Sequence, residues 1–155
     1  MRIPKFMFYA ILFAGISSCG TKTNADRATE SMTEKTSVDN TGDKELITAV
    51  YDKFVFAIDS DGINTPEEYF TANALKKLQE DYEFDCEDGP CYAYYALRTE
   101  AQDSKPGTED VSQICSIEPA ENGWYIVSYS DMGWNGKTRI KIVDGKIDTY
   151  ERLEQ

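Results

Sequence analysis

The chain lacks histidine altogether and has few basic residues for its length of 155. The absence of histidine excludes Ser-His-Asp and Cys-His catalytic arrangements, and it removes the commonest general base and zinc ligand. The 16 lysine and arginine residues face 28 acidic residues, which gives a net charge of −12. A nucleic-acid-binding protein is therefore not expected, because phosphate contacts need clustered cations. There is no glycine loop that could hold a phosphate group, and no cofactor is predicted. The remaining composition, 41% hydrophobic and 28% charged, is that of an ordinary globular protein.

The N-terminus has the order of a bacterial secretion signal. Arg2 and Lys5 precede an apolar run over residues 6–16, which is shorter than the about 20 residues that a membrane-spanning helix needs. The run leads into Ile-Ser-Ser-Cys at 16–19, which resembles the bacterial lipobox. The resemblance implies that the sulfur of Cys19 receives diacylglycerol and that the chain is cleaved just before this residue. The alternative is an ordinary signal peptide that is cleaved elsewhere.

These features predict how the protein is held in a bacterial cell envelope. Residues 1–18 are the predicted lipoprotein signal peptide, and 19–42 are the lipidated Cys19 with a disordered tether that has only four apolar residues. Loss of the signal peptide would remove two basic residues and change the net charge from −12 to −14. The acyl chains, and not surface charge, would therefore bind the lipid bilayer. Gly20 is not the aspartate of the enterobacterial inner-membrane signal, so the outer membrane is the expected location.

The rest of the chain, 43–155, is predicted to fold as one α+β domain. Asp43 can cap a helix over about 44–58. Thr65 begins a second helix over 65–83 with a capping box, and this helix can break and restart at Thr71. The apolar period then becomes alternating, which predicts a four-stranded antiparallel sheet. The expected strands are 111–118, 124–130, 137–143 and 146–152, and the expected turns are 120–123, 133–136 and 144–145.

Two N-terminal helices followed by a curved antiparallel sheet resemble the nuclear-transport-factor-2-like (cystatin-like cone) fold. The segments 94–103 (YYALRTEAQD) and 123–127 (GWYIV) are similar to those of a family of small bacterial lipoproteins of unknown function with such a domain. The resemblance implies two helices packed on a curved, cone-like sheet whose concave face closes a pocket. The superfamily contains isomerases, dehydratases, transport adaptors and binding modules, so the fold alone does not fix the function.

Three cysteines remain for an oxidising compartment once Cys19 is lipidated. Cys86 and Cys91 enclose a Gly-Pro turn, so we expect them to form a short disulfide loop. Cys115 falls within a predicted strand and is expected to be a free, buried small hydrophobe. A disulfide from Cys115 to either of the other two stays open. Three cysteines without histidine favour neither a metal site nor a catalytic thiol.

Aromatic and polar residues around the predicted sheet are candidates for lining the pocket. Alternation in the strand 124–130 would place Tyr125 and Tyr129 on one face, with Trp124 on the other. The alternative is that the candidates fill a dry core, with Arg98 and Asp103 forming a structural pair. The candidate pocket residues are Tyr94, Tyr95, Arg98, Gln102, Asp103, Tyr125 and Tyr129.

The favoured function is a non-catalytic module that binds a small-molecule ligand or an envelope protein. One alternative is a small proton-transfer enzyme, similar to an isomerase or dehydratase, that uses Asp103 with Tyr94 or Tyr95. Another is an acidic binder of cationic proteins or peptides, because the mature chain would carry a net charge of −14 and 80–88 holds six acids in nine residues. A simpler interpretation of that run is a solvated acidic loop. No catalytic or metal-binding residue is assigned.

Overall fold

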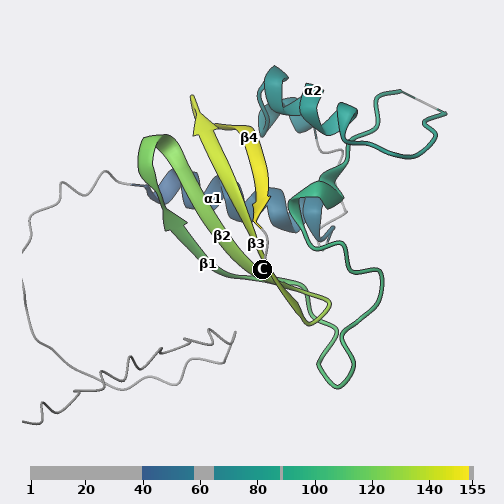
Figure 1. The fold of residues 1–155 in the computed structure, drawn as a ribbon. Coiled ribbons are helices and arrows are strands. Elements are labelled where there is room, and N and C mark those ends of the chain that lie inside the picture. The colour runs from purple at the N-terminus through teal and green to yellow at the C-terminus, as the bar shows by residue number, and fades with distance from the viewer. Residues whose placement is uncertain (1–39, 58–64, 88, 154–155) are drawn as a thin grey trace, which may run out of the picture.

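The structure, a computed structural model, describes residues 40–57, 65–87 and 89–153. These residues form an α+β fold with two α-helices and a four-stranded sheet, which confirms the predicted class (Figure 1). The predicted lipobox, most of the tether and the predicted end of the first helix at residue 58 lie outside the described residues. The elements are α1 (Thr41–Val50), the π-turn η1 (Tyr51–Val55), the 3-10 turn η2 (Pro66–Glu68), α2 (Ala72–Glu80), the 3-10 turn η3 (Tyr94–Leu97), β1 (Gln113–Pro119), the 3-10 turn η4 (Glu121–Gly123), β2 (Trp124–Asp131), β3 (Trp134–Val143) and β4 (Lys146–Leu153).

The sheet is an antiparallel meander in the order β1-β2-β3-β4. Asp144 and Gly145, with φ of 50° and 70°, make the tight turn that their sequence predicts. Of the other two predicted turns, 120–123 contains η4 and joins β1 to β2. The turn at 133–136 is wrong: the turn is made by Met132 and Gly133, with φ of 50° and 82°, and β3 begins at Trp134. Gly136 lies inside β3 opposite Tyr129, where a Cβ would overlap the ring of this tyrosine. Glycine is therefore required at position 136 for side-chain packing and not for a turn.

The first helix begins three residues earlier than its predicted cap. Asn40 occupies the N-cap position, and Asp43 lies in the first turn, where its carboxylate accepts a hydrogen bond from Tyr125 Oη at 2.6 Å. The helix does not continue to residue 58 as an α-helix. It changes into the π-turn η1, which Phe56 closes by donating its N–H to the carbonyl of Tyr51 at 2.8 Å.

The predicted second helix is broken at Thr71. Thr65 makes no side-chain cap, so the predicted capping box is wrong, and the chain forms only the 3-10 turn η2. Thr71 caps α2 instead, since its Oγ1 accepts from the N–H of Ala74 at 3.2 Å. The break lets Thr71 donate its N–H to the carbonyl of Ile147 at 2.8 Å, and Phe70 forms a bridge with Ile147. Two residues therefore leave the helix to pair with the edge strand β4.

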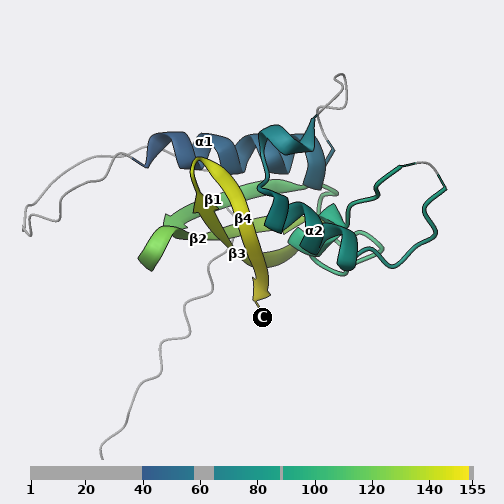
Figure 2. The ribbon, with the colours of Figure 1, turned by 90° about the horizontal axis from the view of Figure 1, so that it is seen from above.

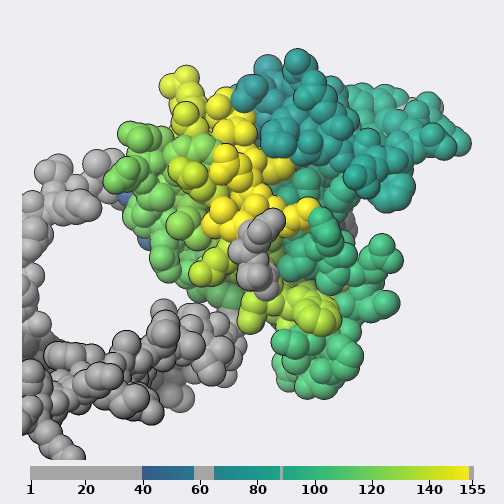
Figure 3. Space-filling model, in the orientation of Figure 1, coloured from purple at the N-terminus to yellow at the C-terminus, as the bar shows by residue number. Residues whose placement is uncertain are grey.

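The core fills the space between the sheet and α1, which runs across one face of the strands (Figures 1 and 2). Ile47 and Val50 of α1 are fully buried, as is Leu78 of α2. In β2, Tyr125 and Tyr129 point into this core while Trp124 faces outward, which confirms the predicted alternation. In Figure 3 the teal surface of α2 adjoins the yellow surface of β4. Within the described part of the chain, no helix combines the length and apolarity needed to cross a membrane.

The cysteines follow the prediction in one case and not in the other. Cys86 and Cys91 form the expected disulfide, with their Cα atoms 6.1 Å apart. Cys115 is exposed and not buried, because the register of β1 shifts between Ile114 and Ser116 and turns this side chain outward. It is also not a free thiol, so both expectations for Cys115 are wrong.

Candidate functional site

A groove with a volume of about 1000 Å³ lies between the C-terminal end of α2 and the segment that follows η3. It is open to solvent on one side, and its lining is mixed polar and apolar. The end of β4 and the β2–β3 turn complete its walls. We call it the binding groove, and it is lined by Glu80, Asp81, Glu83, Phe84, Tyr95, Ala96, Arg98, Thr99, Glu100, Ala101, Gln102, Met132 and Arg152.

Three of the seven candidate pocket residues line this groove, namely Tyr95, Arg98 and Gln102. Tyr125 and Tyr129 do not, since they are 3% and 1% exposed in the core between the sheet and α1. These two tyrosines therefore fill the packed core, as the alternative interpretation of the sequence had it. Alternation along a strand predicts which side chains share a face, but it cannot tell a pocket wall from a packed interior.

The other two candidates also lie elsewhere. The ring of Tyr94 packs against those of Phe54 and Phe70, with centroids 5.0 Å and 5.8 Å away. Burial is the main cause that raises the pKa of Tyr94. The nearby Tyr92 and Glu67 raise this pKa further, by smaller amounts. Asp103 is exposed, and its backbone carbonyl accepts a hydrogen bond from Trp134 Nε1 at 3.0 Å. No hydrogen bond between described residues joins Asp103 to a tyrosine.

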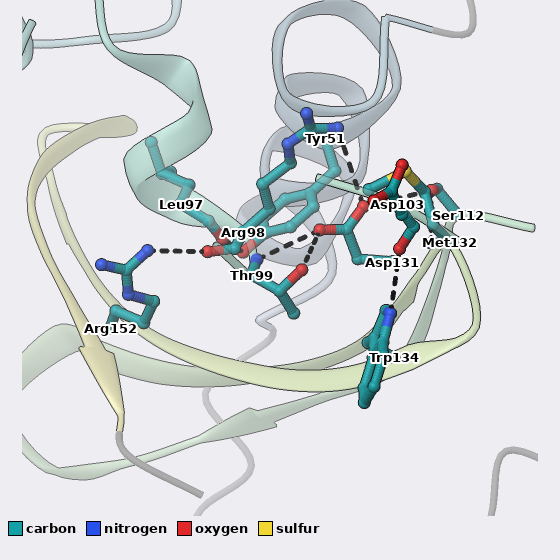
Figure 4. A network of polar contacts seen from close by, with 10 residues as sticks. All are labelled: Tyr51, Leu97, Arg98, Thr99, Asp103, Ser112, Asp131, Met132, Trp134 and Arg152. Atoms are coloured by element: carbon teal, nitrogen blue, oxygen red, sulfur yellow. Dashed lines mark hydrogen bonds and ion pairs between the residues drawn. The ribbon is translucent and has the colours of Figure 1, made fainter. Parts of the chain in front are cut away.

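The floor of the groove is organised by Asp131, which is fully buried at the end of β2 (Figure 4). Its Oδ2 accepts hydrogen bonds from the N–H of Thr99, at 3.2 Å, and from the hydroxyl of the same residue. Its Oδ1 accepts from Ser112 Oγ at 3.3 Å and lies 3.6 Å from the guanidinium of Arg98. Arg98 therefore forms its ion pair with Asp131. The alternative in which Arg98 pairs with Asp103 is wrong.

Sequence reasoning missed Asp131, although a signal was present. It occupies the fourth position on the inward face of β2, after Tyr125, Val127 and Tyr129. A carboxylate on an apolar face must be paired if it is to be buried. Its partners come from the irregular segment before β1, however, and no local pattern identifies them.

A second set of hydrogen bonds holds the start of the groove wall to the core, and Figure 4 draws two of its members, Tyr51 and Leu97. The carbonyl of Leu97 accepts from Tyr51 Oη and from Thr138 Oγ1, both at 2.9 Å. The hydroxyls of Tyr129 and Thr138 are 3.1 Å apart. Burial raises the pKa of Tyr51 and of Tyr129, so both phenols stay neutral at physiological pH. The π-turn that carries Tyr51 and the strand β3 thus fix the residue next to Arg98.

The end of β4 supplies the opposite wall. Arg152 points inward at the open end of the sheet, where its guanidinium donates to the carbonyl of Arg98 at 3.3 Å. The same guanidinium forms an ion pair with Glu100. Both arginines of the groove are therefore already matched by a carboxylate.

The rim of the groove near α2 is acidic, and hydrogen bonds fix its residues in place. The carboxylate of Asp81 accepts from Lys77 Nζ at 2.9 Å and from Tyr150 Oη at 2.6 Å. Burial alone would raise the pKa of Asp81, but these two hydrogen bonds outweigh it and lower the pKa. Tyr95 Oη donates to the backbone carbonyl of Asp81 at 3.1 Å and accepts from the N–H of Glu83 at 3.0 Å. This tyrosine ties the chain after α2 to η3.

Phe84 stands on this rim and is 67% exposed. Its ring makes edge contacts with Tyr82 and Tyr95, at centroid distances of 5.8 Å and 5.9 Å. A large exposed aromatic that is held by neighbouring rings is suited to contact an apolar part of a partner.

The arrangement can bind, since it offers fixed charges, hydroxyls and one exposed ring. Its buried carboxylate and its tyrosines act as structural partners of other groups. Among the described residues, no group of three or more histidine, cysteine or acidic side chains is placed to hold a metal ion.

Comparison with known proteins adds no relative to this description. No family model, no curated protein and no solved structure matches the chain.

Proposed function

We propose that the protein is a lipoprotein of the bacterial envelope whose folded domain binds a ligand or an envelope protein in the binding groove without catalysing a reaction. Acylated Cys19 would anchor it to a bilayer, with the outer membrane as the proposed location. The order of the N-terminal features supports this anchor: a basic start, an apolar run of 11 residues and a lipobox-like 16–19. The tether 19–42 would then present the domain 43–155.

The proposed domain type is the cone-like fold of the nuclear-transport-factor-2-like superfamily. Its support is the succession of two helices and an antiparallel meander, with α1 across one face of the sheet. The groove then lies at the open end of the sheet, where Arg152 and Asp131 end their strands. The superfamily includes silent binding modules, which is the type proposed here.

One observation carries the choice of binding over proton transfer. Several titratable groups in and beside the groove hold structural partners. Asp131 binds the segment before β1, Asp81 binds Lys77, and Arg152 pairs with the carboxylate of Glu100. The proton-transfer alternative needs Asp103 beside Tyr94 or Tyr95, and no hydrogen bond between described residues joins them. A preorganised polar surface with an exposed ring favours recognition.

The anchor is tested by replacing its cysteine. Cys19→Ala should abolish labelling with a radioactive fatty acid and move the protein from the membrane fraction to the soluble fraction. Unchanged membrane partitioning of this variant would contradict the proposed anchor.

The groove is tested by site-specific photocrosslinking in cells that express the full chain. A photoreactive amino acid at position 102, in the groove wall, should give a defined crosslinked product. The same amino acid at the exposed position 137, on the outer face of β3, should not. Phe84→Ala in the 102 background should reduce the product. Equal products from 102 and 137 would contradict binding in the groove.

A further inference from the structure

The rim of the binding groove carries an aromatic anchor that is exposed but held in place. Phe84 is the most exposed large hydrophobic residue among those described, at 67%. Its neighbour Tyr95 fixes the chain that leads into it, through hydrogen bonds with backbone groups of Asp81 and Glu83. The disulfide from Cys86 to Cys91 closes the loop that follows. An anchor that is already ordered loses little conformational entropy on binding, which favours its use as a contact residue.

The charge that remains unmatched in the groove is negative. Both guanidinium groups are already paired with carboxylates. Arg98 pairs with Asp131, and Arg152 pairs with Glu100. On the rim, Glu80 is paired only with Lys76, at 3.5 Å between two well-exposed side chains. Such exposed pairs are weak and exchange readily for another cation.

Glu83 is exposed and makes no ion pair with any of the described residues. It directly precedes Phe84, so a carboxylate and the aromatic anchor stand side by side on the rim. Asp85 and Glu87 follow and are exposed as well. A partner that covers Phe84 therefore meets carboxylates on either side of the ring, and an anionic partner would be repelled.

Access of solvent to the groove favours a chain over a compact small molecule. Sites for small molecules bury most of the ligand surface in an enclosed cleft. This groove has about 1000 Å³ but is open to solvent along one side. An extended segment can lie in it with one side chain against Phe84 and its neighbours beside the carboxylates.

We infer that the occupant of the binding groove is a basic segment of a polypeptide, with an aromatic side chain on Phe84 and cationic side chains beside Glu80 and Glu83. The inference rests on the proposed function, because it names the partner class for the same groove. Recognition combines one apolar contact with charge complementarity, so it weakens with rising salt.

The test uses the full lipidated chain in a neutral detergent and fluorescein-labelled peptides, with binding followed by fluorescence anisotropy. Gly-Lys-Trp-Lys-Gly is the probe, and Gly-Glu-Trp-Glu-Gly and Gly-Lys-Gly-Lys-Gly are the matched peptides. We expect the first to bind at least about fivefold more tightly than either of the others, since each lacks one of the two required features.

Two variants and two matched controls locate the binding. Phe84→Ala should weaken the probe about tenfold and Glu83→Gln about two- to fivefold. Glu121→Gln makes the same change in net charge at the β1–β2 turn, outside the groove, and should leave the affinity unchanged. Val143→Ala removes exposed apolar surface at the far end of β3 and should also have no effect.

Two results would overturn the inference: equal binding of the acidic and basic peptides, or equal loss from Glu83→Gln and Glu121→Gln. A crosslink from position 102 to a partner without a basic-aromatic segment would overturn it too, while leaving the proposed function intact. If position 102 gives no crosslinked product and the basic peptide does not bind, both the inference and the proposed function are contradicted. Because Glu83 and Phe84 are exposed, circular dichroism should show unchanged folding in their variants.

Discussion

Removal of the buried carboxylate of Asp131 should destabilise the protein more than the loss of any exposed acid. Asp131→Ala leaves the N–H of Thr99 and the hydroxyl of Ser112 without their acceptor and takes the counter-charge from Arg98. Each unsatisfied buried donor costs about 1–3 kcal/mol, and breaking a buried ion pair costs about 3–5 kcal/mol. Because the Arg98 side chain is 31% exposed and keeps some water, we expect the lower part of that range, about 3 kcal/mol.

Asp131→Asn separates the hydrogen bonds from the charge. The amide keeps one acceptor oxygen and the shape of the side chain, so it should cost less than alanine, about 1–2 kcal/mol. Asp103→Asn, at an exposed aspartate of the same groove-side segment, is the matched control and should change stability by less than about 0.5 kcal/mol.

The assay is urea unfolding followed by circular dichroism, with the free energy of unfolding extrapolated to water. Both Asp131 variants should also weaken binding in the groove, since Asp131 holds Thr99 and Arg98 in its wall. A loss below about 1 kcal/mol for Asp131→Ala, or equal losses for Asp131→Asn and Asp103→Asn, would refute the reasoning.

Three further predictions concern the disulfide, the sheet and acid stability. Replacing Cys86 and Cys91 by serine should lower the free energy of unfolding by about 2 kcal/mol, measured by thermal unfolding, with a reductant removing the difference from the wild type. Gly136→Ala should cost at least about 1–3 kcal/mol, because its Cβ would overlap a ring of the neighbouring strand, and a neutral result in the same assay would contradict the packing. The lowered pKa of Asp81 means that its hydrogen bonds stabilise the fold above the unfolded pKa of about 3.9 and that this stabilisation is lost as the pH falls through the folded pKa. Tyr150→Phe removes one of these bonds and should move the midpoint of acid unfolding to a higher pH, as followed by circular dichroism.

Local sequence signals predicted the fold best where a segment offered a single turn or a clear alternation. Asp144 and Gly145 form the predicted turn, and the alternation in β2 places Tyr125 inward. The β2–β3 turn was misplaced because the sequence offers glycine at both 133 and 136. In the structure Gly133 takes the turn with a φ of 82°, and Gly136 lies in β3 opposite Tyr129, whose ring leaves no room for a Cβ there.

The candidate site was predictable only in part, for the same reason. Arg98 and Gln102 lie in a polar segment after an aromatic run, and this local pattern placed them in the groove wall. Asp131 needs partners from a segment about 30 residues away in the chain, and Phe84 depends on the ring of Tyr95. Long-range contacts of this kind leave no local period in a sequence.

The central claim, a non-catalytic domain that binds its partner in this groove, is tested most directly by hydrogen–deuterium exchange of the full lipidated chain. The exchange would be compared with and without the partner isolated through the crosslink at position 102. The account predicts slower exchange of backbone amides in 80–84 and 95–102, with no change in the strand β3. Protection confined to β3, or no protection in either groove segment, would contradict it.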